Sequence, residues 1–392
     1  MKTLVLSCST GQGHNAAAAA IAEELIARGI SCKSDEVLSF ASKDVADTVK
    51  NTYDSMVLNH PRTFKSLIRI GGLMSSPRHR SPVYLANSKY ADNLGAYIEG
   101  EGIDTVICSH MFPAQALTAL ISHGLKVRSY AVATDYLCLP FWEECSMDCF
   151  IVPHKDVVPE FVRRGIPEQK VRPLGLPIRQ MFRIGRTRDE AREQLGLDTK
   201  AVVYLVLTGS MGFGRLSGLP RMLLEGDENA QVVVVAGRNA GLFDALENEY
   251  GQNPRFRAVG YTDEIATYMD AASVVLTKPG GLTSTEVAAK RIPLVHMPAI
   301  PGFEMRNAVF FSQRGMSARA ENCDEAAGLA VMLAHCREEC NRMLAAQRAN
   351  IDAFAVCRIC DHIQRDAGEE PSASPASAMA AKYFEQAEAY RG

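Results

Sequence analysis

Short apolar segments alternate with helical patterns along this chain, and the alternation occurs in two separate series. The first series opens with Leu4–Ser7, which precedes an Ala-rich helical pattern from Asn15 to Arg28. The second opens with Ala201–Leu207, after Asp198. Strands that are apolar throughout are typical of parallel sheets covered by helices on both faces. The pattern therefore predicts an α/β protein with two doubly wound domains, one after the other.

The remaining strands and the domain boundaries follow from the same pattern. Further strands are expected at Ser31–Val37, Asp104–Ser109, Ser129–Thr134, Cys149–Pro153, Gln231–Ala236, Phe256–Val259, Ala272–Leu276 and Ile292–His296. Pro173, Gly175 and Pro177 interrupt any helix between the two series. We therefore expect an N-terminal domain over residues 1–176 and a C-terminal domain over 177–365. Residues 366–392, rich in Pro, Ser and Ala at first, are expected to form a linker and a tail helix.

The composition excludes several classes of protein. A formal net charge of −3 provides no overall basic field that would attract nucleic acid. Eleven cysteines, an odd number, in a chain of 392 residues favour reduced thiols over a disulfide scaffold. The apolar run Leu4–Leu6 is too short for a signal peptide, and no stretch approaches the roughly 20 apolar residues of a membrane-spanning helix. We therefore expect an intracellular protein that is soluble or at most lies on a membrane face.

A glycine-containing turn joins the first strand to the first helix. Gly11, Gly13 and Ala16 fit the dinucleotide-binding pattern G-x-G-x-x-A, and Asp35 lies about 20 residues further on, where a ribose-binding acid would lie. Glycines at this place let the backbone approach a phosphate closely at the positive end of the following helix. This short pattern is weak evidence by itself. The turn predicts a phosphate or acceptor loop, with dehydrogenase chemistry as an alternative.

His14 occupies the first turn of that helix. The positive end of a helix disfavours an imidazolium ion, so the ring should be neutral near pH 7 and suited to act as a general base. The alternative is a tight strand-to-helix turn that happens to contain a polar histidine.

A second glycine motif, Lys278–Glu286, lies between a later strand and its helix. Gly280 and Gly281 would allow a phosphate to lie near the start of the helix, and Glu286 could accept hydrogen bonds from ribose hydroxyls. The alternative is purely local: Thr283 and Glu286 have the spacing of a helix-capping box.

Three more loops follow strands of the second series. Gly209 and Ser210 follow its first strand, and Gly237 and Arg238 follow its second. The carboxyl ends of parallel strands are where open α/β sheets bind ligands. Arg238 could offset the charge of a diphosphate, although a solvated surface arginine is the simpler alternative. Glu304, in the loop after Ile292–His296, could accept hydrogen bonds from sugar hydroxyls.

Together these motifs resemble one family. The chain is similar to monogalactosyldiacylglycerol synthases and processive diacylglycerol glucosyltransferases, which are related to the lipid-linked GlcNAc transferase of murein synthesis. The resemblance covers residues 1 to about 365. It rests on T-G-Q-G-H from Thr10, V-A-T-D-Y from Val132, G-L-P-I-R from Gly175, K-P-G-G-L-T-S-T-E from Lys278 and P-G-F-E-M-R-N-A from Pro301.

The resemblance implies a GT-B fold, in which two Rossmann-like domains face each other across a cleft. It implies that the C-terminal domain binds a UDP-sugar and the N-terminal domain binds the acceptor. The residues that it assigns to the donor are Gly280, Gly281, Thr283, Glu286, Glu304 and Asn307. His14 falls on the family's candidate catalytic histidine, and Asp135 falls on its acceptor-side Thr-Asp motif, so either could be the base.

Two departures from the family pattern affect specificity. Phe303 stands where the family usually has a glutamine, which removes an amide near the transferred sugar. A histidine that often follows the Thr-Asp motif is replaced near Leu139 and Pro140. The identities of the sugar and of the acceptor are therefore left open.

A basic and apolar stretch without acidic residues runs from Ser55 to Ala91. It suits an anionic membrane surface, whereas the alternative is a helix pair with a solvated basic face. No nucleic-acid-binding motif accompanies it. The residues expected to contact the membrane are Arg62, Lys65, Arg69, Arg78 and Arg80.

Metal sites are not expected. Cys336, Cys340, Cys357 and Cys360 have spacings that would allow zinc binding on two helices, but each pair also fits an ordinary packing face. No D-x-D pair is present to bridge a metal to a diphosphate.

The function expected from the whole is inverting transfer of a hexose from a UDP-sugar to a lipid hydroxyl, most simply that of diacylglycerol, without a cofactor. The site of action would be the inner face of the cell membrane, with the protein bound peripherally from the cytoplasm. The alternatives are a UDP-sugar-binding membrane sensor without catalytic activity and a transferase with a soluble acceptor.

Overall fold

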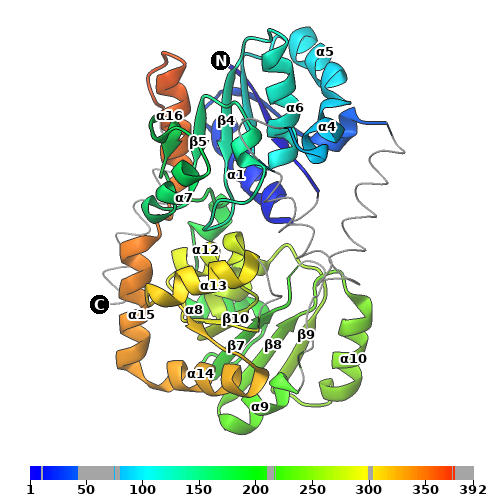
Figure 1. Cartoon of the computed structure of the whole chain (residues 1–392). Helices are drawn as coiled ribbons and strands as arrows, with labels where there is room; N and C mark the ends of the chain where they lie inside the picture. The colour runs from blue at the N-terminus through cyan, green and yellow to red at the C-terminus, as the bar shows by residue number, and fades with distance from the viewer. Residues whose placement is uncertain are drawn as a thin grey trace. The chain divides into compact units, whose positions relative to one another are not determined.

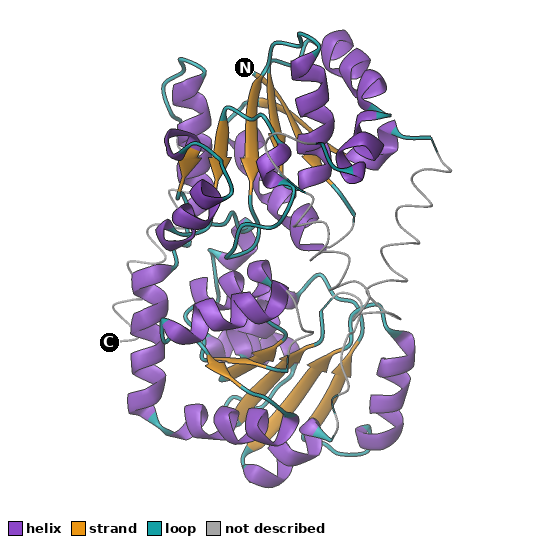
Figure 2. Ribbon diagram, viewed as in Figure 1, coloured by secondary structure: helices purple, strands orange, loops and turns teal. Residues whose placement is uncertain are grey.

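The computed structural model describes residues 1–9, 12–42, 75, 80–209, 216, 218–298, 303–372 and 374–375. The chain forms two compact units. Unit 1 comprises Met1–Gln180 and the C-terminal residues from Phe354, and unit 2 consists chiefly of Met181–Ile300 and Glu304–Ala353 (Figure 1). Each unit contains a six-stranded sheet flanked by helices (Figure 2), which confirms the predicted α/β class with two doubly wound sheets.

Unit 1 is built on a parallel sheet with the strand order β2-β1-β3-β4-β5-β6. Its strands are β1 Lys2–Ser7, β2 Ser31–Glu36, β3 Thr105–Cys108, β4 Arg128–Val132, β5 Cys149–Ile151 and β6 Val171–Arg172. Its α-helices are α1 Gln12–Ala27, α4 Pro82–Ser88, α5 Ala91–Glu101, α6 Met111–Ser122, α7 Val158–Arg163 and α16 Ala355–Asp366. Short 3-10 turns lie at Val37–Phe40, Trp142–Glu144, Lys155–Val157 and Glu168–Lys170.

Unit 2 repeats the arrangement, with the parallel strand order β12-β11-β10-β7-β8-β9. Its strands are β7 Val202–Leu207, β8 Ala230–Val235, β9 Phe256–Val259, β10 Val274–Thr277, β11 Leu294–His296 and β12 Ala318–Arg319. Its helices are α8 Arg188–Leu195, α9 Leu219–Gly226, α10 Ala240–Tyr250, α11 Ile265–Ala271, α12 Gly281–Ala289, α13 Phe303–Gln313, α14 Cys323–His335 and α15 Arg337–Asn350. A 3-10 turn at Gln180–Phe182 leads into this unit.

The expected strands are all present, with ends within two residues of those predicted. Leu4, Val5 and Leu6 of β1 are fully buried, as continuous apolar strands in a covered sheet should be. The sequence analysis missed β6 and β12. Each is an edge strand of two residues, too short to show any periodicity.

The predicted boundary at residue 365 is wrong, because α16 packs in unit 1. Its apolar face, Val356, Ile359, Cys360 and Ile363, shares one core with Ile21 of α1. Polar contacts fix the same pair of helices. The side chain of Arg28 is 1% exposed and donates to Asp361 at 2.6 Å, to Gln364 at 2.9 Å and to the Cys357 carbonyl.

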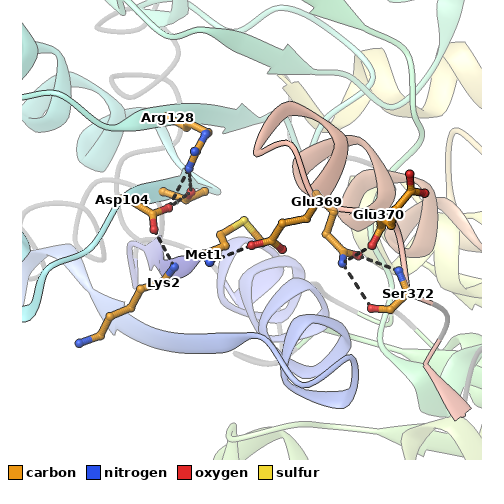
Figure 3. Close-up of polar contacts among 9 residues, drawn as sticks. Met1, Lys2, Asp104, Arg128, Glu369, Glu370 and Ser372 are labelled. Atoms are coloured by element: carbon orange, nitrogen blue, oxygen red, sulfur yellow. Dashed lines mark hydrogen bonds and ion pairs between the residues drawn. The ribbon is translucent and has the colours of Figure 1, made fainter.

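After α16 the chain returns to the beginning of the first strand (Figure 3). The Met1 amino group donates to Glu369 at 2.8 Å. Asp104 accepts from the Lys2 backbone and from Arg128, each at 2.9 Å. The first residues of the predicted linker are therefore ordered against β1, whereas the predicted tail helix lies outside the described residues.

Within the part of the chain that the structure describes, no helix combines the length and the apolar character needed to cross a bilayer.

Candidate functional site

Both sheets have a point where the strand order reverses, and the candidate residues gather there. In unit 1 the order reverses between β1 and β3, and in unit 2 between β7 and β10. Ligands of open α/β sheets bind outside the carboxyl ends of the strands at such points. Each unit therefore has its own candidate ligand edge at its strand-order reversal.

His14 lies at the reversal point of unit 1. Helix α1 begins at Gln12, so His14 is in the first turn, as predicted. Its Nδ1 atom is 3.0 Å from the carbonyl oxygen of Ser109, after β3, and 2.9 Å from the hydroxyl of Thr134, after β4. A carbonyl oxygen can only accept, so Nδ1 carries the ring proton. The lone pair of the neutral ring is then on Nε2, which can accept a proton.

The environment of His14 favours the neutral ring. Burial lowers the pKa of His14, while the charge of half-buried Asp135 and the bond to Ser109 act in the opposite direction. Of the effects of burial, charge and hydrogen bonding, the loss of water around the ring is the largest, and it lowers the pKa of His14. His110, which precedes α6, is 6% exposed and lies beside His14, with ring centroids 4.5 Å apart.

The other residues singled out around the first glycine turn lie away from these contacts or outside the described residues. Gly13 is within α1, and Gly11 lies outside the described residues. Asp35, the candidate ribose acid of the dinucleotide alternative, is in β2 and accepts from the Tyr97 hydroxyl at 3.2 Å. Sequence reasoning did not single out Ser109 or His110. Their place directly after a buried parallel strand was the signal that could have found them.

Glycine turns line the corresponding edge of unit 2. Gly209 follows β7 with φ of +79°, and Gly237 follows β8 with φ of +62°, a left-handed region that favours glycine. A Cβ atom at Gly209 would lie 2.9 Å from Cε of Lys278, a flexible side chain that could shift, so the positive φ is the stronger reason for glycine here. Ser210 lies outside the described residues.

Helix α12 presents its start at the same edge. Gly280 is the N-cap residue, with φ of −71° and ψ of 138°, and as a glycine it has no side chain to cap the helix. The first N–H groups of such a helix are suited to bind an anion. Thr283 is the third helical residue and Glu286 the sixth, so they cannot form a capping box across the helix start, and that interpretation is wrong. Glu286 is 6% exposed, and Gly281 is buried.

Lys278 and Glu304 form an ion pair beside these turns. Lys278 Nζ donates to Glu304 Oε1 at 2.8 Å, and the two side chains are 29% and 24% exposed. Glu304 Oε2 is buried and accepts no hydrogen bond from the described residues. Such an oxygen is suited to accept from a ligand hydroxyl. Glu304 and fully buried Asn307 both belong to α13. Sequence reasoning quoted Lys278 in a motif without assigning it a role.

Arg238 is exposed, with its guanidinium 4.7 Å from the centroid of the Tyr261 ring. The next residue, Asn239, caps α10 by accepting from the Leu242 N–H at 2.9 Å. The arginine therefore lies on the surface at the end of β8, and its aromatic neighbour was not anticipated.

His296 at the end of β11 was also missed. It is fully buried, with Nε2 2.9 Å from the Ser284 hydroxyl of α12 and Nδ1 3.0 Å from the Ser317 hydroxyl. Burial lowers the pKa of His296 to about 3. A neutral ring thus ties α12, the helix that presents Gly281, to the sheet edge.

Of the predicted membrane residues, Arg62, Lys65, Arg69 and Arg78 lie outside the described residues. Arg80 is exposed but has local partners: it donates to the Glu144 carbonyl, and its guanidinium lies 4.2 Å from the centroid of the Tyr84 ring. This single position thus has a structural role in unit 1.

The cysteine pairs lie in different units. Cys336 and Cys340 lie at the start of α15 in unit 2, whereas Cys357 and Cys360 are on α16 in unit 1, where Cys360 is fully buried in the core. Within the described ranges, no group of three or more His, Cys, Asp or Glu residues is placed to hold a metal ion.

Each unit matches a family model of known proteins. The family model for monogalactosyldiacylglycerol (MGDG) synthase matches residues 14–178, and that for the glycosyltransferase family 28 C-terminal domain matches residues 203–359. The chain is 26% identical over 251 residues to a processive diacylglycerol beta-glucosyltransferase of Staphylococcus epidermidis, and the match spans 64% of each chain. It is 28% identical over 219 residues to the protein of that name from Staphylococcus carnosus, across 55% of this chain and 56% of that one.

The fold also matches a solved structure. Acinetobacter baumannii MurG superposes with a TM-score of 0.62 at 14% identity, over 93% of this chain and 99% of that one. The two sheets therefore form a GT-B fold. The chain therefore carries an MGDG synthase domain followed by a family 28 glycosyltransferase C-terminal domain, and it is similar to processive diacylglycerol beta-glucosyltransferases.

Proposed function

We propose that this protein is an inverting glycosyltransferase that moves a hexose from a UDP-sugar to the hydroxyl of diacylglycerol. The observation that carries the proposal is the hydrogen bonding of His14. Its Nδ1 proton is held by the Ser109 carbonyl, so Nε2 has the lone pair that a general base needs. The names of the curated relatives support a diacylglycerol acceptor and suggest glucose as the first sugar to test.

In the proposed reaction, His14 Nε2 takes the proton of the lipid hydroxyl while its oxygen attacks the anomeric carbon. The attack comes from the face opposite UDP, so the bond to the diphosphate oxygen breaks and the configuration is inverted. Asp135 stabilises the imidazolium that forms, because its charge raises the pKa of His14. Asp135 is therefore assigned the supporting role, although sequence alone left it as a rival base.

Unit 2 would hold the donor. The start of α12 at Gly280 and Gly281 suits the diphosphate, and Glu286 suits the ribose. The buried oxygen of Glu304 suits a sugar hydroxyl, and Lys278 fixes that carboxylate through its other oxygen. Arg238 and the helix start would offset the charge of the departing UDP. With these groups in place we propose that no metal is needed, so turnover should be unchanged in excess EDTA.

A diacylglycerol acceptor would place the reaction at a membrane surface. The basic residues Arg62, Lys65, Arg69 and Arg78 would hold the protein on the anionic cytoplasmic face as a peripheral enzyme.

The test is transfer of labelled hexose from UDP-glucose and UDP-galactose to vesicles that contain diacylglycerol. We expect a labelled glycolipid from one donor, and β-linked product from the α-linked donor as the signature of inversion. Labelling of a soluble acceptor in the absence of vesicles would favour the soluble-acceptor alternative. Tight UDP-sugar binding with no product from any donor would favour the sensor alternative and contradict the proposal.

A further inference from the structure

Two consecutive residues contact His14 from different directions. The carbonyl of Ser109 accepts the Nδ1 proton, and the ring of His110 lies against the ring of His14, with centroids 4.5 Å apart and an interplanar angle of 78°. Both residues follow β3 directly and lead into α6. The segment Ser109–His110 therefore fixes both the nitrogen that carries the ring proton of His14 and the orientation of the ring.

His110 is itself held in one protonation state. It is the N-cap residue of α6, and its Nδ1 accepts the Phe112 N–H at 3.1 Å. A nitrogen that accepts this bond cannot carry a proton, so the neutral ring has its proton on Nε2, and a second proton would break the cap. Burial and the neighbouring His14 hold the pKa of His110 well below its usual range.

The ring of His110 is also fixed from its other side. Phe112 lies edge-on to it, with centroids 4.6 Å apart and an interplanar angle of 86°. The three rings of His14, His110 and Phe112 thus pack in two successive T-shaped contacts, a favourable aromatic geometry. Rotation of His110 would lose the helix cap and both contacts.

The charges around His14 act in one direction. Asp135 favours the protonated ring, and a neutral His110 adds no opposing charge. The ionised cluster of α1 and α16, around Arg28 and Asp361, is at the far end of α1, about 21 Å along the helix axis. His14 can therefore gain a proton without repulsion from a charged neighbour on α6.

We propose that His110 is a positioning residue, whose neutral, helix-capping ring keeps water from His14 and holds the His14 ring where the Ser109 carbonyl accepts the Nδ1 proton and Nε2 can accept another. This inference rests on the proposed role of His14. It gives the N-terminus of α6 a part in the reaction without contact to either substrate.

The test separates the ring from the cap. His110→Asn keeps an efficient capping side chain but removes the ring, whereas His110→Phe keeps a ring but removes the capping acceptor. Each is labelled with ¹³C and ¹⁵N at histidine, and the His14 signals are assigned by their loss in His14→Ala. NMR titration then reports the pKa and the tautomer of His14 without requiring turnover.

We expect the wild-type ring to show Nδ1–H and to titrate below the ordinary histidine range. In His110→Asn the midpoint should move up toward about 6.5 as water enters, the acid limb of kcat should move to higher pH with it, and kcat should fall on the order of tenfold. His110→Phe should keep the wild-type midpoint and lower the melting temperature.

An unchanged His14 midpoint and tautomer in His110→Asn would overturn the inference and leave His110 as a helix cap only. Equal shifts in both variants would also overturn it, because the cap and not the ring would then be responsible. If the shift occurs only in His110→Asn while the wild-type protein transfers no sugar, the positioning inference stands and the proposed function fails.

Discussion

The two strand-order reversals have opposite chemical characters. In unit 1 the reversal is dominated by aromatic rings: His14 and His110 pack together, and burial lowers the pKa of each. In unit 2 it is dominated by glycine backbone: left-handed turns at Gly209 and Gly237 and the start of α12 at Gly280, beside an ion pair whose side chains are 29% and 24% exposed. The same place in the same fold is therefore used in two ways.

The difference between the two sheet edges follows from their proposed roles, proton transfer in unit 1 and donor binding in unit 2. A base has to stay neutral until it receives a proton, and removal of water lowers the pKa of an imidazole. A diphosphate carries its charge throughout, and it is best met by N–H groups of a helix start that remain accessible. We therefore expect substitutions at the strand-order reversal of unit 1 to lower kcat. Substitutions at the reversal of unit 2 should instead weaken the binding of the UDP-sugar.

The largest effect is expected for membrane binding. Changing Arg62, Lys65, Arg69 and Arg78 to Gln should weaken binding to anionic vesicles about 1,000-fold, from about 1 kcal/mol for each basic residue near the surface. Vesicle flotation measures this. UDP affinity, measured by calorimetry, should not change.

Arg80→Gln is the matched control, since Arg80 bonds to the Glu144 carbonyl: it should lower the melting temperature and leave flotation nearly intact. Salt-insensitive flotation of the wild type would refute electrostatic docking.

His14→Ala should reduce kcat by about 100-fold or more, because the proton acceptor is lost. Asp135→Asn is the comparison variant. It should lower kcat by less, since His14 remains and only the charge that stabilises its protonated form is removed. Both variants should bind UDP like the wild type. A larger loss for Asp135→Asn than for His14→Ala would make Asp135 the base.

Glu286→Ala should weaken UDP binding about 10- to 150-fold, which corresponds to about 1.5–3 kcal/mol for a hydrogen bond to a charged group. Isothermal titration calorimetry with UDP measures it. Unchanged affinity with a lower melting temperature would show that Glu286 serves the helix and not the donor.

The smallest effect is expected for the free energy of unfolding at acid pH, and it depends on the protonation of His296. The folded-state pKa is about 3. The unfolded value is about 6.5. Between these values the unfolded chain binds more protons, so stability is present above about pH 6.5 and is lost as the pH falls toward 3. From pH 6.5 to 5 the loss should be about 2 kcal/mol.

His296→Asn is the variant for this test, because it offers polar atoms to Ser284 and Ser317 without a titrating ring. Urea unfolding followed by circular dichroism should show a shallower loss of stability with acid in the variant than in the wild type. Parallel pH dependence in the two proteins would mean that His296 is not the group responsible.

Local patterns in the sequence were sufficient for the strands, for the glycine turns and for the place of His14 on α1. They failed where a residue's partner lies far away in the chain. The spacing of Val356, Ile359, Cys360 and Ile363 shows an amphipathic helix, but not that its apolar face joins Ile21. The low pKa of His14 is likewise due chiefly to burial, which its place in the sequence does not reveal.

The capping-box interpretation failed for a local reason. Thr283 and Glu286 have the correct spacing, but a capping box also requires the first residue to have an extended backbone at the helix start. That conformation belongs to Gly280, whose carbonyl accepts the first helical bond from Ser284 N–H at 3.0 Å. Sequence spacing alone does not fix where a helix begins.

The most direct test of the account is the pH dependence of a single turnover, with enzyme in excess over labelled UDP-sugar and with diacylglycerol vesicles as acceptor. We predict that the wild-type rate falls below an apparent pKa lower than that of an ordinary histidine, because burial favours the neutral His14 ring. In His14→Ala the rate should be lower by about 100-fold or more, with that acid limb gone and UDP affinity intact. An acid limb that persists in His14→Ala, or a near-wild-type rate, would contradict the assignment of proton transfer to His14.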